Sequence, residues 1–146
     1  MGLAGHGDGL YAVDERGLPV RAAIVAMDTR AEPVLEEWRG TQIWSRALEL
    51  SGTVPFAGSP AALLARHEPA VLQQARWLLS CKDWLRLTGA VATDPTDASA
   101  SFTDLRRGGY SPDLIAGSYS INQVVSERPV ADPRWQVRHF VRRGSG

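Results

Sequence analysis

The stretch from residue 5 to residue 31, GHGDGLYAVDERGLPVRAAIVAMDTRA, constrains the fold more than any other part of the chain. Leu10–Val13 is a short apolar run enclosed by Gly9 and the turn residues Asp14–Gly17, which is typical of a partly buried strand entering a hairpin. From residue 20 to residue 27 apolar side chains fall on both faces of an extended segment. We therefore expect a second strand covered on both faces, paired antiparallel with the first, inside a layered α/β domain.

Glycines and polar side chains gather at the open end of this predicted hairpin. Antiparallel pairing brings Gly5–Gly9 beside Asp28–Arg30. Glycine lets the backbone approach a ligand and offer its N–H groups, and the Asp8 carboxylate can accept hydrogen bonds from two neighbouring hydroxyls. This arrangement suits a sugar or a polyol. The alternative is a flexible turn at Gly5–Gly9, helix capping by Asp28 and a solvated Arg30, and the pattern alone favours that alternative.

Charge and composition narrow the possible partners. The chain has 146 residues, at most one domain, and its 16 basic and 16 acidic residues leave no net charge. No field of one sign favours nucleic acid or an anionic membrane. The apolar runs are too short to span a bilayer and the first residues do not resemble a signal peptide, so we expect a cytoplasmic protein. The lone Cys81 and the scattered His6, His67 and His139 give no metal-ligand spacing, so no protein metal site is expected.

Beyond residue 30 the apolar spacing becomes helical. Pro33, Pro60 and Pro69 each suit the first turn of a helix, and Gly40 and Gly52 suit helix ends. We expect Thr41 to cap the second helix, with an apolar stripe made of Ile43, Trp44, Ala47 and Leu48.

A buried strand is expected at residues 77–79, followed by a helix over residues 81–88. Ser80 and Asp83 stand at capping-box spacing, which places Cys81 in the first turn of that helix. Asp94 and Asp97 are interpreted as turn residues with a structural role, because an Asp-Pro-Thr-Asp stretch caps its own backbone.

Two ordered blocks of the sequence resemble the FGGY family of carbohydrate kinases. The first is the hairpin, through Gly5-His6-Gly7-Asp8-Gly9, Asp14, the turn from Gly17 to Pro19, and Asp28-Thr29-Arg30. The second is residues 78–105, LLSCKDWLRLTGAVATDPTDASASFTDL, which is similar to the family's Lys-Asp-aromatic-Leu, Leu-Thr-Gly and Asp-Ala-Ser pattern. Together the resemblance covers about residues 5–115.

The resemblance implies a fold and a domain division. It implies an α/β fold that is part of a ribonuclease H-like, actin-like ATPase domain, with a β-hairpin plus helices and without the family's first strands. Residues 1–116 would be a fragment of the family's N-terminal domain, and residues 117–146 a divergent, poorly ordered tail.

The resemblance also implies an activity, that of an ATP- and Mg²⁺-dependent kinase with an alcohol group as acceptor. Gly7, Asp8, Gly9, Asp28 and Phe56 fall where the family binds its sugar, although a core aromatic accounts for Phe56 equally well. The Gly-Asp-Gly turn, and a small Ala26 where glycerol kinases have tryptophan, are similar to the branch that acts on L-xylulose-like ketoses or tetritols such as erythritol.

Departures from the family pattern support a different function. The phosphate-binding Asp-x-Gly-Thr hairpin does not occur in the sequence, and the segment that carries the family's catalytic base is not matched, so no catalytic residue is assigned. The alternative is therefore a truncated, non-catalytic remnant or a sugar-binding or interaction module, with the isolated chain inactive. The partner expected in either case is a small sugar or polyol.

Overall fold

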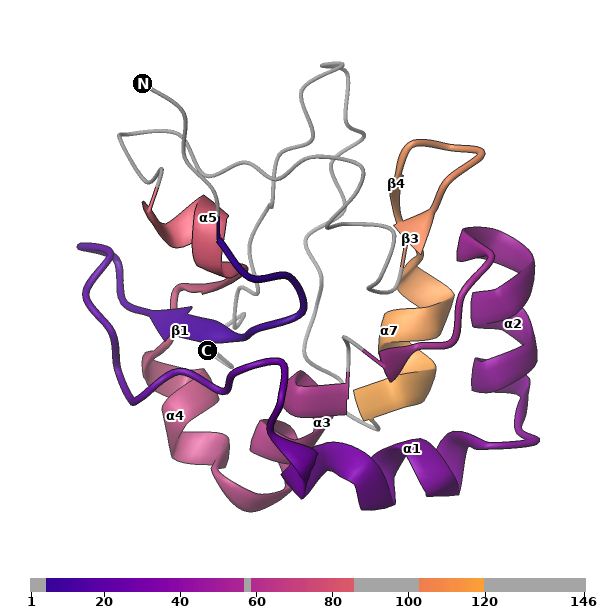
Figure 1. The fold of residues 1–146 in the computed structure, drawn as a ribbon, viewed down its shortest axis with the longest axis horizontal. Coiled ribbons are helices and arrows are strands. Elements are labelled where there is room, and N and C mark those ends of the chain that lie inside the picture. The colour runs from indigo at the N-terminus through magenta and orange to yellow at the C-terminus, as the bar shows by residue number, and fades with distance from the viewer. Residues whose placement is uncertain (1–4, 57–58, 86–102, 120–146) are drawn as a thin grey trace, which may run out of the picture.

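The computed structural model describes residues 5–56, 59–85 and 103–119. Short helices dominate this part of the chain, together with two small antiparallel sheets (Figure 1). Its elements are β1 (Tyr11–Val13), η1 (Thr29–Ala31), α1 (Glu32–Trp38), α2 (Gln42–Ser51), α3 (Ser59–His67), α4 (Pro69–Gln74), β2 (Trp77–Leu79), α5 (Cys81–Leu85), β3 (Thr103–Asp104), β4 (Gly109–Tyr110) and α7 (Pro112–Tyr119). In Figure 1, β1, α4 and α5 lie at one end of the molecule, and α2, α7 and the β3–β4 hairpin lie at the other.

The turn that follows β1 is the one expected from the sequence. The Asp14 carboxylate accepts hydrogen bonds from the N–H groups of Arg16 at 2.8 Å and Leu18 at 2.9 Å. Gly17 donates its N–H to the Asp14 carbonyl and has φ 78°, a left-handed conformation that glycine adopts without steric cost. The predicted reversal of the chain after Val13 is confirmed.

The regular second strand expected over residues 20–27 is not present. The returning arm meets β1 through two isolated bridges, Val13 with Pro19 and Leu10 with Ile24. Because the arm has two more residues between these bridges than β1 has, it must bulge instead of pairing residue by residue. Ile24 is buried, whereas Val25 is 46% exposed and Met27 is 88% exposed. The expectation that both faces are covered was therefore wrong.

The regular partner of β1 is β2, the strand predicted at residues 77–79. The two strands are antiparallel, with Tyr11 opposite Leu79 and Val13 opposite Trp77. Arg76 extends the pairing by donating its backbone N–H to the Val13 carbonyl at 2.7 Å. Ala12, Val13 and Leu79 are buried, so this small sheet contributes its own apolar contacts.

The helices begin and end close to the predicted positions. Gly40 and Gly52 follow α1 and α2 with φ 75° and 73°. Pro60 is the second residue of α3 and Pro69 is the first residue of α4. Thr41 occupies the N-cap position of α2, but its hydroxyl caps no N–H group of that helix. It donates instead to the Trp38 carbonyl at 2.6 Å, which satisfies the end of α1.

The main apolar cluster lies among α1, α2, α3 and α7. Its buried members are Val34, Trp38, Ala47, Leu50, Ala62, Leu114 and Ile115. The buried stripe of α2 differs from the expected one, because Leu50 is buried while Leu48 is 43% exposed. Leu50 follows Ala47 by three positions and Leu48 follows Trp44 by four, so helical spacing allows either leucine, and the neighbouring helices determine which of the two faces them.

Several expectations fall partly outside the described residues. The helix predicted over residues 81–88 is confirmed from Cys81 to Leu85, and Asp94 and Asp97 lie outside the described part. The helix α7 crosses position 117 and ends at Tyr119. Residues 120–146 are not described, so the proposed division of the chain at residue 117 stays a prediction.

Candidate functional site

Residues Gly5–Gly9, called the glycine turn from here on, pack tightly at both ends and are open in the middle. A Cβ atom on Gly5 would lie 3.0 Å from the Cys81 Sγ, and a Cβ on Gly9 would collide with the His6 ring. Nothing lies within 4 Å of the corresponding position on Gly7. Asp8 has φ 60°, which is uncommon for a residue with a side chain. The turn therefore presents its middle outward on a constrained backbone.

An aromatic row supports the glycine turn. The His6 and Tyr11 rings have centroids 6.0 Å apart, and Tyr11 stacks on Trp84 with centroids 5.2 Å apart and an interplanar angle of 24°. The Trp84 indole N–H donates to the Gly17 carbonyl at 3.0 Å. This row joins the glycine turn, β1 and the hairpin turn, which are consecutive in the sequence, to α5, and its Trp84–Gly17 bond spans 67 positions.

The first turn of α5, just before Trp84, carries polar groups. Interaction with the Cys81 side chain, together with burial, raises the pKa of Tyr11. Asp83 is 4% exposed, and Lys82 donates to its carboxylate at 3.0 Å. A buried carboxylate is retained at low cost only when it is paired, and Lys82 provides that pairing.

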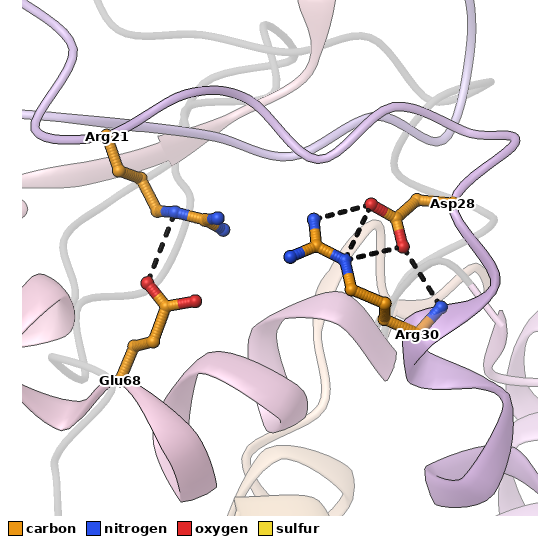
Figure 2. Close-up of polar contacts among 4 residues, drawn as sticks. All are labelled: Arg21, Asp28, Arg30 and Glu68. Carbon is orange, nitrogen blue, oxygen red and sulfur yellow. Dashed lines mark hydrogen bonds and ion pairs between the residues drawn. The ribbon is translucent and has the colours of Figure 1, made fainter.

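Asp28 and Arg30 form a compact ion pair where the returning arm meets η1. The Asp28 carboxylate accepts hydrogen bonds from the Arg30 backbone N–H, from Nε and from Nη2, at distances between 2.5 and 3.0 Å (Figure 2). These bonds from Arg30 lower the pKa of Asp28 to about 2. Asp28 is also the N-cap of η1, as expected from the sequence.

A second ion pair faces the first. Arg21 Nε lies 3.3 Å from Glu68 Oε2, and the Arg21 side chain is only 16% exposed. Figure 2 shows the guanidinium groups of Arg21 and Arg30 turned toward each other, each beside its own carboxylate. Arg21 Nη1 is buried and makes no hydrogen bond within the described part of the chain. The two pairs fasten the returning arm to η1 and to the start of α4.

The structure places the predicted site residues in three surroundings. Leu10 bridges Ile24, so the segments that flank this bridge, the glycine turn and Asp28–Arg30, both begin at the open end of the hairpin, as expected. The described contacts of the glycine turn are with α5 and Tyr11, whereas those of Asp28 and Arg30 are with each other and with the charges of Arg21 and Glu68. Phe56 is half-buried after α2, and its N–H donates to the Val54 carbonyl. A role in binding stays a prediction for all of these residues.

The sequence pattern did not identify four residues that lie around the candidate site: Arg21, Glu68, Tyr11 and Trp84. Arg21 carried a weak signal, since it is the one charged residue inside the apolar segment 20–27. The stacking of Tyr11 on Trp84 had no local signal in the sequence, because the helices α1 to α4 lie between β1 and α5.

The described residues were also compared with the requirements of a metal site and of a membrane-spanning helix. Among them, no group of three or more His, Cys, Asp and Glu side chains could hold a metal ion. No described helix is both long and apolar enough to cross a membrane.

An open groove of about 420 Å³ lies between α2 and α7, lined by Gln42, Ile43, Ser45, Arg46, Glu49, Asp113 and Leu114. None of these residues was predicted to belong to the site.

Residues 1–123 match the family model described as the FGGY family of carbohydrate kinases, N-terminal domain. The chain belongs to this family. The match includes both sequence blocks and every predicted site residue. The resemblance found from those blocks is thereby confirmed.

Similar proteins of this family are sugar and polyol kinases by name. The chain is 29% identical to erythritol kinase of Brucella abortus, over 90% of this chain and 29% of that protein. It is 36% identical to xylulose kinase of Streptomyces rubiginosus, over 69% of this chain and 22% of that protein. The chain therefore spans less than a third of the length of these relatives.

Solved structures show the same fold. Xylulose kinase from Rhodospirillum rubrum superimposes with a TM-score of 0.67 at 25% identity, over 88% of this chain and 26% of that one. A xylulose kinase from Brucella ovis gives a TM-score of 0.66 at 24% identity, over 77% of this chain and 24% of that one. The predicted kinship of the fold with sugar kinases is confirmed.

Proposed function

We propose that this chain forms the acceptor-binding part of an ATP-dependent carbohydrate kinase that acts on a ketose or a polyol. Membership in the FGGY family supports the reaction class, and the similarity to erythritol kinase and xylulose kinase supports the class of acceptor. In this proposal the chain is part of a ribonuclease H-like domain. The observation that carries the proposal is the glycine turn, whose middle is open and whose Asp8 is held in an uncommon conformation.

Each residue of the proposed site has a chemical role. The backbone N–H groups of Gly7 and Gly9 donate to sugar oxygens, and the Asp8 carboxylate accepts from two adjacent hydroxyls. The Asp28 oxygens are already engaged by Arg30. In our proposal Asp28 therefore acts by holding Arg30 at the edge of the site. Phe56 contributes apolar surface to the same acceptor site.

ATP and Mg²⁺ are implied by the family. When bound, they supply the phosphoryl group and neutralise charge that develops on its oxygens. The described residues hold no cluster of carboxylates that fits Mg²⁺, so we assign no ligand of ATP or Mg²⁺ and no catalytic base to them. Positioning the acceptor hydroxyl is the contribution that these residues can make.

The first experiment measures binding of erythritol, D-xylulose, L-xylulose and glycerol to the purified 146-residue chain by calorimetry. The test variant is Asp8→Asn, because asparagine tolerates a positive φ and has nearly the shape of aspartate. Hydrogen bonds to a charged group contribute about 1.5–3 kcal/mol, so we expect Asp8→Asn to weaken binding at least about tenfold. Glu15→Gln, at an exposed position of the hairpin turn, is the matched control.

The outcomes separate the proposals. Binding of one acceptor that depends on Asp8 supports the acceptor site, and the absence of binding by a folded chain refutes it. We further propose that the chain by itself transfers no phosphate, since it spans less than a third of the length of its relatives. A coupled assay of ATP turnover tests this, and phosphorylation that depends on Asp8 would show that the transfer chemistry also resides in these residues.

A further inference from the structure

We propose that His6 is a positioning residue, whose imidazole ring holds the glycine turn in the conformation that presents Asp8. This inference rests on the proposed function, in which the Asp8 carboxylate accepts hydrogen bonds from the acceptor. That function gives roles to Gly7, Asp8 and Gly9 and none to His6, so the inference adds a residue to the candidate site.

Asp8 adopts a backbone conformation that is unfavourable for a residue with a side chain. Its φ is 60°, whereas Gly7 and Gly9 on either side lie outside the left-handed region. A left-handed conformation lowers the population of such a residue by about fivefold or more, although aspartate tolerates it better than most residues do. Asp8 therefore stays in this conformation only if the contacts around the turn favour it.

The His6 ring lies against Gly9, three residues further along the chain. A Cβ atom on Gly9 would lie 2.4 Å from His6 Nε2 and 3.1 Å from His6 Cδ2. The edge of the ring thus occupies the place of a side chain at position 9, and it fits there because residue 9 is glycine. Gly9 is buried although His6 itself is exposed. The ring therefore closes the turn from His6 to Gly9, with Asp8 between the two ends.

Tyr11 supports the His6 ring from β1. The two ring centroids lie 6.0 Å apart at an interplanar angle of 44°, a separation typical of aromatic pairs. Tyr11 Cε2 also lies 3.3 Å from the position of a Cβ on Gly9, so both rings approach Gly9 on the same side. Tyr11 is itself stacked on Trp84 in α5. Through these contacts the His6 ring ties the conformation of the glycine turn to β1 and α5.

The first test is an NMR measurement of the backbone conformation of Asp8 in the purified 146-residue chain without ligand. The HN–Hα coupling constant and the carbon chemical shifts of Asp8 report its φ. His6→Ala removes the ring, so Asp8 should leave the left-handed region in most molecules, whereas His6→Phe keeps a ring against Gly9 and should keep Asp8 there. His67→Ala, at the exposed end of α3, is the matched control and should have no effect. An Asp8 that stays left-handed in His6→Ala would overturn the proposal.

The second test is a double-mutant cycle on His6 and Gly9, measured as midpoints of urea denaturation. Gly9→Ala places a methyl group where the His6 ring lies, so it should lower the midpoint in the wild-type background. In the His6→Ala background the ring is gone and the methyl group meets Tyr11 Cε2 at 3.3 Å, so the midpoint should fall less. The effect of alanine on the unfolded chain is common to both backgrounds and cancels. Equal falls in the two backgrounds would refute the contact on which the proposal stands.

The third test measures the dissociation constants for erythritol and L-xylulose. When the binding conformation of Asp8 is only partly populated, the dissociation constant rises by the inverse of that population. We expect a rise of about fivefold for His6→Ala and of less than about twofold for His6→Phe. Equal losses in the two variants would indicate a direct contact between a His6 nitrogen and the acceptor, and would overturn the positioning role. A wild-type chain that binds neither compound refutes the proposed function instead, and the NMR measurement and the cycle then decide the role of His6 by themselves.

Discussion

The contrast between Gly5 and Gly7 gives a sharp test of the packing around the glycine turn. Both are exposed glycines outside the left-handed region of φ, so alanine is compatible with either backbone. Their surroundings differ: a methyl group on Gly5 meets two Cys81 atoms and a backbone nitrogen at 3.0–3.1 Å, whereas a methyl group on Gly7 meets nothing within 4 Å. The same substitution therefore tests crowding at one position and open space at the other.

The two substitutions should change the free energy of unfolding differently. Gly5→Ala forces the turn or the start of α5 to shift, and overpacking of this kind costs about 1–3 kcal/mol of unfolding free energy. Gly7→Ala restricts the unfolded chain without a clash, so it should leave stability unchanged or raise it by up to about 1 kcal/mol. The two variants should thus differ by at least about 1 kcal/mol.

Urea denaturation followed by tryptophan fluorescence measures this difference, since Trp84 lies in α5 next to the contact. The midpoint of Gly5→Ala should fall below that of the wild type at an unchanged m-value, and the midpoint of Gly7→Ala should not. Equal midpoints for the two variants would refute the close approach of the glycine turn to Cys81. A lower midpoint for Gly7→Ala alone would place the crowding in the middle of the turn and not at Gly5.

Four other changes test separate features of the structure. Leu64→Ala should lower the free energy of unfolding by about 2–5 kcal/mol in urea denaturation, because Leu64 is 1% exposed. The pKa of Asp28 is lowered from 3.8 to about 2, so its stabilisation is complete above pH 3.8 and is lost as the pH falls through about 2; the melting temperature of Asp28→Asn should therefore fall less than that of the wild type over this range. Met27→Lys should change stability by less than about 0.5 kcal/mol, since the side chain is 88% exposed, and a larger loss would restore the covered strand expected from the sequence. Glu68→Gln removes the carboxylate beside the largely buried Arg21 and should cost about 1 kcal/mol in the same denaturation assay.

Local signals predicted most of the elements correctly. Pro33, Pro60 and Pro69 lie in the first turns of helices, and Gly40 and Gly52 follow helix ends, because these residues act through their own backbone. The turn at Asp14 was predictable for the same reason, since its side chain bonds residues two and four positions ahead. In each case the interaction that determines the structure joins residues that are close together in the sequence.

Features that depend on distant residues were not predictable. The returning arm bulges because its two bridges enclose different numbers of residues on the two arms, and alternation of apolar residues does not contain that information. Burial of Leu50 in place of Leu48 depends on the neighbouring helices. The candidate site shows the same division: Asp8 and Asp28 stand in motifs, whereas the pairing of Arg21 with Glu68 requires the fold.

The pairing of β1 with β2 also has a consequence for the order of folding. The bond between Trp84 and Gly17 joins residues 67 positions apart, and α1 to α4 all lie within the loop that β1 and β2 close. Closing a long loop costs entropy before any contact repays it, so local helices form early and such a sheet forms late. We therefore expect the glycine turn to gain its contacts with α5 only at that last step. In the proposed function, an acceptor bound at the glycine turn would stabilise the closed loop, so that ligand binding would be coupled to completion of the fold.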